Sequence, residues 1–286
     1  MKIFFSDVDH TFISHEAPLP PVNRKAMREV EKRGHRLVFV TGRAYSEFKE
    51  LQKQYRLRND VIYCNGAGIC YYGEKPQVIQ GITLAQLMAA LEMLDQSQAL
   101  YMVNTADGDV MRPLESFQTK LDELEDHLSK EVPPRPMKFI DHIQHETRNA
   151  IFTDDVKTWF LEHPETVIVK LLVYTFDYQA MYSLQPQLDA IGLHGYFSFA
   201  VAFEITHQKA NKGEALRYYC QDLPVEKTYG FGDMENDLPM LEAADVGIAV
   251  SNGAQGLKAR ADEVIGECSE GAVGAYILKE IADSSD

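Results

Sequence analysis

The chain has 286 residues, of which 45% are hydrophobic and 25% are charged. This composition is that of a globular protein with one large domain or two modest ones, and it excludes a disordered or fibrous chain. Acidic residues outnumber basic ones by 43 to 28, so the net charge is −15. Because no run of Lys and Arg forms a basic stripe, neither nucleic acid nor an anionic membrane is an expected partner.

The sequence also bears on the compartment. No apolar run reaches the length of a membrane span, and the first residues lack the apolar core of a signal peptide, so we expect a cytoplasmic protein. Cys64, Cys70, Cys220 and Cys268 show neither CxxC spacing nor the density of a secreted scaffold. We expect them to be free thiols, mostly in the core. Nothing in the sequence indicates the oligomeric state.

Strands and helices alternate at the start of the chain. A short apolar strand is predicted over 3–5, followed by a helix over 23–33 that Gly34 is placed to end. Residues 37–40 form a continuous apolar strand, of the kind that is buried on both faces in a parallel sheet. The next predicted elements are a helix with Phe48, Leu51 and Tyr55 on one face and a strand over 61–64.

The middle of the chain has a different pattern. It contains a helix beginning near Leu84, a strand over 99–103, an acidic amphipathic helix around 114–128, and long alternating or apolar strands over 167–175 and 196–205. Such a block is typical of an α+β domain with an antiparallel sheet. We therefore predict that residues 83–205 are an inserted domain and that 1–82 and 206–286 form one core domain.

From Asn211 onward the alternation of helix and strand resumes. Strands are predicted over 228–231, 246–250 and 263–265, and helices over 211–221, up to 244, near 254–260 and over 273–281. Both ends of the chain together predict an α/β fold, a doubly wound parallel-sheet core of Rossmann-like type.

Two of the predicted core strands end in acidic residues. The first runs into Asp7-Val8-Asp9, and a later one leads into Asp233-Met234-Glu235-Asn236-Asp237. Asp-x-Asp alone is more often an acidic pair in a turn. In open α/β sheets, however, the ligand crevice lies outside the carboxyl ends of the strands, so both clusters are expected at one edge. Several carboxylates there suit a hard divalent cation such as Mg²⁺.

Two further segments are expected at the same edge. Thr41-Gly42-Arg43 follows the strand over 37–40, and Lys212 begins the helix after the middle domain. Taken singly, Lys212 would be a solvated lysine, and Thr41 and Gly42 would be ordinary turn residues. Arg43 is equally compatible with a contact to substrate phosphate and with a structural ion pair.

In this order the segments resemble the motifs of the haloacid dehalogenase superfamily, and within it those of the Cof-like group with a large type C2 cap after the second motif. DVDHT at 7–11 resembles the DxDGT motif, and GDMEND at 232–237 resembles the GDxxND motif. VTGR at 40–43 and NKGEAL at 211–216 resemble the second and third motifs, and NGA at 65–67 and FEI at 203–205 resemble segments that flank the cap. The resemblance spans both ends of the chain.

The resemblance implies a role for each acidic residue. Asp7 would be the nucleophile that attacks phosphorus and forms an aspartyl-phosphate. Asp9 would be the general acid toward the leaving alkoxide and then the base toward water, and neighbouring negative groups are expected to raise its pKa. Mg²⁺ would be held by the Asp7 carboxylate, the Asp9 backbone carbonyl and Asp233. Asn236 and Asp237 would orient water ligands and the lysine of the site.

The remaining residues would bind the phosphoryl group. Thr41 Oγ, the Gly42 amide and Lys212 would contact its oxygens, and Arg43 is a further candidate. One position departs from the family's pattern, because His10 stands where the family usually has Gly. His10 either contacts the substrate or points to solvent, and we favour solvent.

These observations predict a Mg²⁺-dependent phosphatase for small phosphorylated metabolites such as sugar phosphates or cofactor phosphates, with the inserted domain closing over the site and setting substrate choice. One alternative is a phosphomutase or phosphotransferase on the same fold, similar to phosphomannomutases. The other is a non-catalytic module, which the presence of Asp7, Asp9, Lys212 and Asp233 argues against. The substrate itself and the residues that would contact it are not evident from the sequence.

Overall fold

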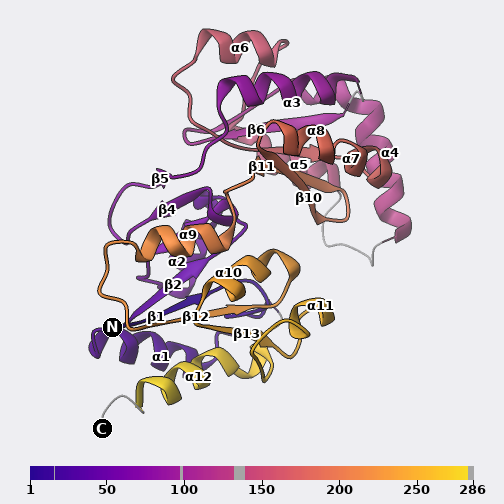
Figure 1. Ribbon diagram of the computed structural model, residues 1–286. Coiled ribbons are helices and arrows are strands. Elements are labelled where there is room, and N and C mark those ends of the chain that lie inside the picture. Colours follow the sequence, from indigo (N-terminus) through magenta and orange to yellow (C-terminus); the bar gives the residue numbers. More distant parts are fainter. Residues whose placement is uncertain (16, 97–98, 132–138, 283–286) are drawn as a thin grey trace. The chain divides into compact units, whose positions relative to one another are not determined.

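The computed structural model describes residues 1–15, 17–96, 99–131 and 139–282, and among these no helix is long and apolar enough to cross a membrane. The chain forms two compact units, as Figure 1 shows. Unit 1 consists of Met1–Ile79 and Lys209–Asp286, and unit 2 consists of Gln80–Gln208. The two ends of the chain therefore fold together, and the segment 83–205 lies within unit 2.

The centre of unit 1 is an eight-stranded sheet. Its strands are β1 (Lys2–Ser6), β2 (Arg36–Val40), β3 (Val61–Tyr63), β4 (Gly68–Cys70), β5 (Gln77–Val78), β12 (Lys227–Gly232), β13 (Val246–Val250) and β14 (Glu263–Ile265). They follow the order β14-β13-β12-β1-β2-β3-β4-β5. Strand β4 pairs antiparallel with both β3 and β5, and the other neighbouring strands pair parallel. Strand order reverses between β1 and β12, which is where such a sheet forms a ligand crevice.

Helices cover both faces of this sheet, which confirms the predicted doubly wound α/β core. In Figure 1, α9 (Lys212–Cys220) and α10 (Leu238–Ala243) lie on one face, while α1 (Pro21–Lys32) and α12 (Ala272–Ala282) lie on the other and pack together. Unit 1 also contains α2 (Tyr45–Tyr55), α11 (Gln255–Lys258) and the 3₁₀ turns η1 (Cys64–Gly66), η4 (Glu235–Asp237) and η5 (Cys268–Glu270).

The apolar strands pack on both of these layers. Ile3 and Phe5 belong to a buried cluster with Leu216 of α9 and Met240 of α10. Because successive side chains of a strand point to opposite faces, Phe4 lies on the other side, where its ring stacks on Tyr229 at 4.8 Å between centroids. Burial on both faces explains why these strands are continuous apolar runs in the sequence.

Unit 2 contains a six-stranded sheet in the order β10-β11-β9-β6-β7-β8. Strands β7 and β8 pair parallel, and the other neighbouring strands pair antiparallel. The strands are β6 (Leu100–Thr105), β7 (Asp109–Met111), β8 (Ile151–Phe152), β9 (Ile168–Tyr174), β10 (Leu193–Phe199) and β11 (Ala202–His207). The helices are α3 (Leu84–Gln96), α4 (Gln118–Glu131), α5 (Phe139–Glu146), α6 (Val156–Glu162), α7 (Tyr178–Ser183) and α8 (Gln185–Ala190), with 3₁₀ turns η2 (Leu114–Phe117) and η3 (Thr147–Asn149).

Two buried clusters pack against this sheet. One joins Leu87 and Leu91 of α3 to Val103 and Leu171 of the strands. The other joins helices α4 and α5 to a different set of strand residues that includes Leu100 and Met102. Unit 2 thus has a core of its own.

The prediction of a single strand over 196–205 is wrong. The structure has a hairpin instead, in which β10 and β11 pair antiparallel and Phe199 lies opposite Ala202. The two residues between them, Ala200 and Val201, include no Gly, Pro, Asn or Asp to indicate a turn. Val201 is moreover fully buried, so the apolar pattern continues through the turn and imitates one long strand.

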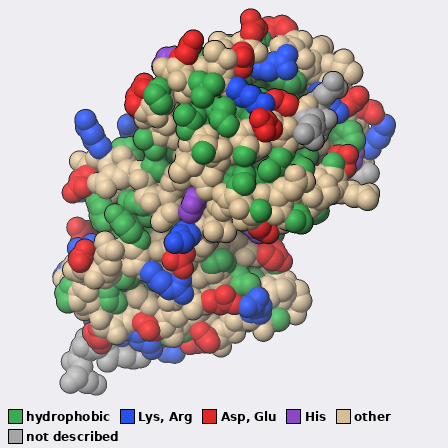
Figure 2. Space-filling model, turned by 45° about the horizontal axis from the view of Figure 1, so that its top comes forward, with side chains coloured by type: hydrophobic (Ala, Val, Ile, Leu, Met, Phe, Trp, Pro, Cys, Tyr) green, Lys and Arg blue, Asp and Glu red, His purple; other side chains and the backbone are tan. Residues whose placement is uncertain are grey.

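Two smaller expectations concern thiols and surface charge. Each of the four cysteines is a thiol outside any disulfide, and all but Cys220 are buried, as predicted. On the face drawn in Figure 2, Lys and Arg side chains are interspersed with Asp and Glu and do not merge into one continuous stripe. The exclusion of nucleic acid as a partner stays a prediction.

Candidate active site

The two acidic clusters of the sequence lie side by side in unit 1. Strand β1 pairs with β12, so that Ser6 lies opposite Phe231, and the backbone N–H of Asp7 donates to the Phe231 carbonyl at 2.9 Å. Asp7 and Asp233 each follow directly after these neighbouring strands. The predicted convergence at the carboxyl edge of the sheet is therefore observed.

Lys212 is the cation at the centre of this cluster. Its side chain is 0% exposed, and Nζ donates to Asp7 Oδ1 at 2.7 Å and to Asp237 Oδ1 at 2.5 Å. Burial lowers the pKa of Lys212, but the carboxylates of Asp237 and Asp7 outweigh burial and raise it above its ordinary value. The side chain is therefore a fixed ammonium.

Local sequence explains how Lys212 reaches this place. The Asn211 side chain caps α9 by accepting from the N–H groups of Gly213 and Glu214 at 3.1 and 2.9 Å, which puts Lys212 in the first turn. A Cβ at Gly213 would lie 2.2 Å from the Pro239 carbonyl oxygen, so only glycine allows α9 to approach α10 this closely. The lysine is thus directed into the cluster by a cap and a close helix contact.

Asp237 connects the lysine to the loop after β12. While Oδ1 accepts from Lys212, Oδ2 accepts from the backbone N–H groups of Asp233 and Met234 at 2.9 and 3.1 Å. A Cβ at Gly232 would lie 2.3 Å from Asp237 Cβ, so glycine is required where this loop turns back. Asp237 therefore holds both Lys212 and the backbone of Asp233.

Asp7, Asp233 and Asp237 form a buried group whose oxygens lie within 4.8 Å of one another. Burial, above all, and the charges of Asp237 and Asp233 raise the pKa of Asp7 well above its ordinary value despite Lys212. Burial and Asp237 likewise raise the pKa of Asp233 to about 6, although its Oδ1 accepts from Thr11 Oγ1 at 3.0 Å.

This donor set fits a divalent metal ion. Three carboxylates face a single ammonium, so the cluster has an excess of negative charge that a cation would neutralise. All the donors are oxygens, which hard cations such as Mg²⁺ prefer. Of the predicted ligands, the carboxylates of Asp7 and Asp233 lie together here, and the third carboxylate of the group is that of Asp237. The backbone carbonyl of Asp9 stays a predicted ligand.

The Asp9 side chain faces different partners. Arg43 donates to it through two groups, Nε to Oδ2 at 2.7 Å and Nη2 to Oδ1 at 2.8 Å, and His15 Nε2 lies 2.5 Å from Oδ1. Burial raises the pKa of Asp9, but the hydrogen bonds and charges of Arg43 and His15 outweigh it and lower the pKa. The expected rise is wrong, because the side chain is directed toward two donors instead of toward the other carboxylates.

The segment after β2 supplies further polar groups. Thr41 is buried and its Oγ1 accepts from the Arg43 N–H at 3.1 Å, and a Cβ at Gly42 would lie 3.2 Å from Asn65 Nδ2. Asn236 donates to Asn65 Oδ1 at 3.1 Å. Arg43 is occupied by the Asp9 ion pair, one of the two roles considered for it.

Thr11 and His15 contact Asp233 and Asp9 respectively, and neither is among the residues predicted for the site. Thr11 could have been found as the last residue of the first acidic motif, whereas nothing in the sequence indicates His15. His10 is exposed, and its ring packs edge-on against that of His15 with 5.2 Å between centroids.

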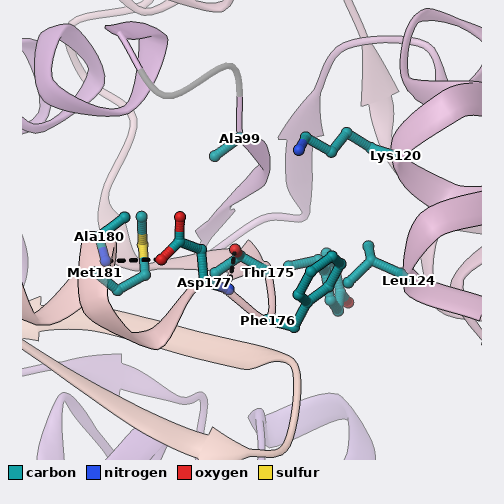
Figure 3. A pocket seen from close by; sticks show the side chains of 9 residues that line it. Ala99, Lys120, Leu124, Thr175, Phe176, Asp177, Ala180 and Met181 are labelled. Atoms are coloured by element: carbon teal, nitrogen blue, oxygen red, sulfur yellow. Dashed lines mark hydrogen bonds between the residues drawn. The ribbon is translucent and has the colours of Figure 1, made fainter. Parts of the chain in front are cut away.

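A small cavity of about 140 Å³ lies in unit 2 and is shown in Figure 3. Its lining is mixed, with Lys120 and Asp177 beside Leu124, Phe176 and Met181. Its lining residues come entirely from unit 2, so it does not include the acidic cluster.

Residues 4–277 match the sequence profile of haloacid dehalogenase-like hydrolases. The chain belongs to this family. It is 25% identical to the phosphatase YwpJ of Bacillus subtilis, over 98% of this chain and 100% of that protein. It is 22% identical to the pyridoxal phosphate phosphatase YbhA of Escherichia coli, over 98% of this chain and 98% of that protein.

Solved structures agree on the fold. A haloacid dehalogenase-like hydrolase from B. subtilis superposes with a TM-score of 0.79 at 24% identity, covering 97% of this chain and 99% of that chain. The predicted family, its Cof-like group and the α/β fold class are confirmed. As a haloacid dehalogenase-type phosphatase, the protein is a phosphoric monoester hydrolase that acts on small phosphate substrates.

Proposed function

We propose that this phosphatase is Mg²⁺-dependent and hydrolyses small phosphomonoesters through a phosphate ester of Asp7. The observation that carries the proposal is the contact between Asp7 and the buried ammonium of Lys212, next to the carboxylate of Asp233. A buried carboxylate beside a fixed cation is suited to attack on a phosphoryl group, because the cation attracts the negatively charged oxygens that would otherwise repel the nucleophile.

In the first step a carboxylate oxygen of Asp7 forms a bond to phosphorus while the bond from phosphorus to the ester oxygen breaks. Lys212, Thr41 and the Gly42 amide bind the phosphoryl oxygens, and Asp9 gives a proton to the leaving oxygen. In the second step water attacks the aspartyl-phosphate, Asp9 takes a proton from that water, and phosphate leaves with Asp7 restored. Atoms and protons balance over the cycle.

Asp9 must lose its contact with Arg43 to act as an acid. Two hydrogen bonds from Arg43 favour its ionised form, as its lowered pKa reflects. A substrate phosphate is itself a bidentate acceptor for a guanidinium, so it would compete with Asp9 for Arg43. We infer that substrate binding draws Arg43 toward the phosphate and allows Asp9 to carry a proton.

Mg²⁺ would be held by the carboxylates of Asp7 and Asp233 and the backbone carbonyl of Asp9, and it would supply positive charge to the phosphoryl oxygens. Asp237 would act through its contacts, since both of its oxygens are occupied by Lys212 and the backbone. Asn236, whose side chain donates to Asn65, would help to orient the polar groups of the site.

For the substrate we propose sugar phosphates or cofactor phosphates, with residues of unit 2 setting the choice as an inserted cap. The similarity to a pyridoxal phosphate phosphatase supports a cofactor phosphate as one member of this class. A screen of phosphorylated metabolites with phosphate release as the readout would identify the substrate.

The test of the proposed function uses purified protein, p-nitrophenyl phosphate and a colorimetric assay for inorganic phosphate. We expect turnover with Mg²⁺, none after chelation with EDTA, and none in Asp7→Asn. A phosphomutase would instead return the phosphoryl group to a sugar with little free phosphate. Normal turnover by Asp7→Asn would refute the nucleophile assignment.

A further inference from the structure

Asp9 has a second side-chain partner besides Arg43, and it comes from its own loop. His15 Nε2 lies 2.5 Å from Asp9 Oδ1. The loop between them is closed by backbone hydrogen bonds: the Val8 carbonyl accepts from Phe12 and Ile13 at 3.0 and 2.8 Å, and the His10 N–H donates to the Ile13 carbonyl at 2.9 Å. This closure turns the chain back and brings His15 to Asp9.

The ring of His15 has a neighbour of its own. The His10 ring packs edge-on against it, at 5.2 Å between centroids and 69° between planes. His10 has φ of 59°, a left-handed conformation that costs a side chain other than glycine about 1 kcal/mol. Its carbonyl accepts from Asn252 Nδ2 at 2.8 Å, which helps to hold this conformation. The imidazole at this strained position therefore makes a ring contact that glycine would lack.

The two partners of Asp9 bind it differently. Arg43 contacts both carboxylate oxygens, whereas His15 contacts only Oδ1. If Arg43 moves to a substrate phosphate, Oδ1 stays bound to His15 and Oδ2 is released. A carboxyl group held at one oxygen can carry a proton at the other in a fixed direction.

We propose that His15 is a positioning residue for Asp9. It holds Oδ1, so that Oδ2 gives the proton to the ester oxygen in the first step and takes one from water in the second. His10 supports the ring of His15. The inference rests on the proposed function, in which Asp9 is the general acid. It adds two residues of this chain to the reaction, neither of which contacts the substrate in this role.

The experiment compares two leaving groups in variants of the full chain. An alkyl phosphate such as β-glycerophosphate needs a proton on its leaving oxygen, whereas p-nitrophenolate leaves without one. The ratio kcat/KM reports the steps up to loss of the leaving group, before water attacks the intermediate that both substrates share. General acid catalysis contributes about 10²–10⁴-fold, so we expect His15→Ala to lower kcat/KM on the alkyl phosphate by about 10-fold or more. On p-nitrophenyl phosphate the change in kcat/KM should stay within about 2-fold, because its leaving oxygen needs no proton.

Three further variants make the result specific. His15→Gln, which keeps a donor in place of Nε2, should recover part of the lost kcat/KM, and His10→Ala should show the same selectivity with a smaller loss. Arg217→Ala breaks an exposed ion pair with Glu214 elsewhere in unit 1 and should affect neither substrate. The His15 side chain is 40% exposed, so these substitutions should leave the unfolding midpoint unchanged.

Asp9→Asn separates failure of the inference from failure of the proposed function. If Asp9→Asn lowers kcat/KM selectively for the alkyl phosphate but His15→Ala lowers kcat/KM for both substrates equally or for neither, the positioning role is wrong and the general acid stands. If Asp9→Asn itself shows no selectivity, Asp9 is not the acid and both proposals fall.

Discussion

Replacing Lys212 with methionine should destabilise the protein strongly at neutral pH. The ammonium is 0% exposed, lies 2.7 Å from Asp7 Oδ1 and 2.5 Å from Asp237 Oδ1, and those carboxylates are 10% and 1% exposed. At an effective dielectric constant of about 20, each such contact is worth about 6 kcal/mol before desolvation. Removal of one partner from a buried pair costs about 3–5 kcal/mol, because a charge is left buried without compensation.

Urea unfolding of metal-free protein at pH 7.5 measures this loss. The double variant Lys212→Met/Asp237→Asn should recover part of it, since one of the stranded carboxylates is removed with the cation. Mg²⁺ should also stabilise Lys212→Met more than it stabilises the unmodified protein, because the cluster then has one positive charge fewer. If Lys212→Met unfolds at the same urea concentration as the unmodified protein, the reasoning about a neutralising ammonium is refuted.

Three other predictions concern stability. Asp7→Asn should abolish phosphate release. Its free energy of unfolding in urea without metal should nevertheless match or exceed that of the unmodified protein, because burial disfavours ionised Asp7. A loss of stability above about 1 kcal/mol would contradict this. The pKa of Asp233 is about 6 in the folded protein, above its ordinary 3.8, so its contribution to stability is present below pH 3.8 and is lost as the pH rises through 6. Because Mg²⁺ binds the ionised carboxylate, it should raise the thermal midpoint more at pH 7.5 than at pH 5. Equal shifts at the two pH values would contradict this role of Asp233. Gly213→Ala should lower the free energy of unfolding by about 1–3 kcal/mol, because its Cβ would lie 2.2 Å from the Pro239 carbonyl oxygen. Gly256→Ala should leave the free energy of unfolding unchanged, because no atom lies nearer than 3.4 Å to its Cβ. Similar effects of the two substitutions would disprove the close contact between the helices.

The sequence predicted the parallel core well because its strands are buried on both faces. Residues 246–250, for instance, form an unbroken apolar run and are observed as β13 with the same bounds. The hairpin of β10 and β11 was missed because its turn is made of Ala200 and a buried Val201, which carry no turn signal. Local chemistry identifies such a turn only when its backbone requires Gly, Asn or Pro.

The sequence predicts which residues converge at the site, but it does not predict which partners each side chain contacts. Asp7, Lys212 and Asp233 meet because the ends of neighbouring strands meet, and strand order follows from topology. The direction of the Asp9 carboxylate depends instead on Arg43 and on a loop that returns His15 to it. Those contacts reverse the expected sign of the Asp9 pKa shift.

The most direct test of the account is to identify the phosphorylated residue. Asp9→Asn with p-nitrophenyl phosphate should accumulate the intermediate, because the first step then needs no acid while the second lacks its base. Acid quenching, borohydride reduction and mass spectrometry of the N-terminal peptide should reveal homoserine at position 7. Unmodified Asp7, or reduction at any other carboxylate, would contradict the claim that Asp7 is the nucleophile.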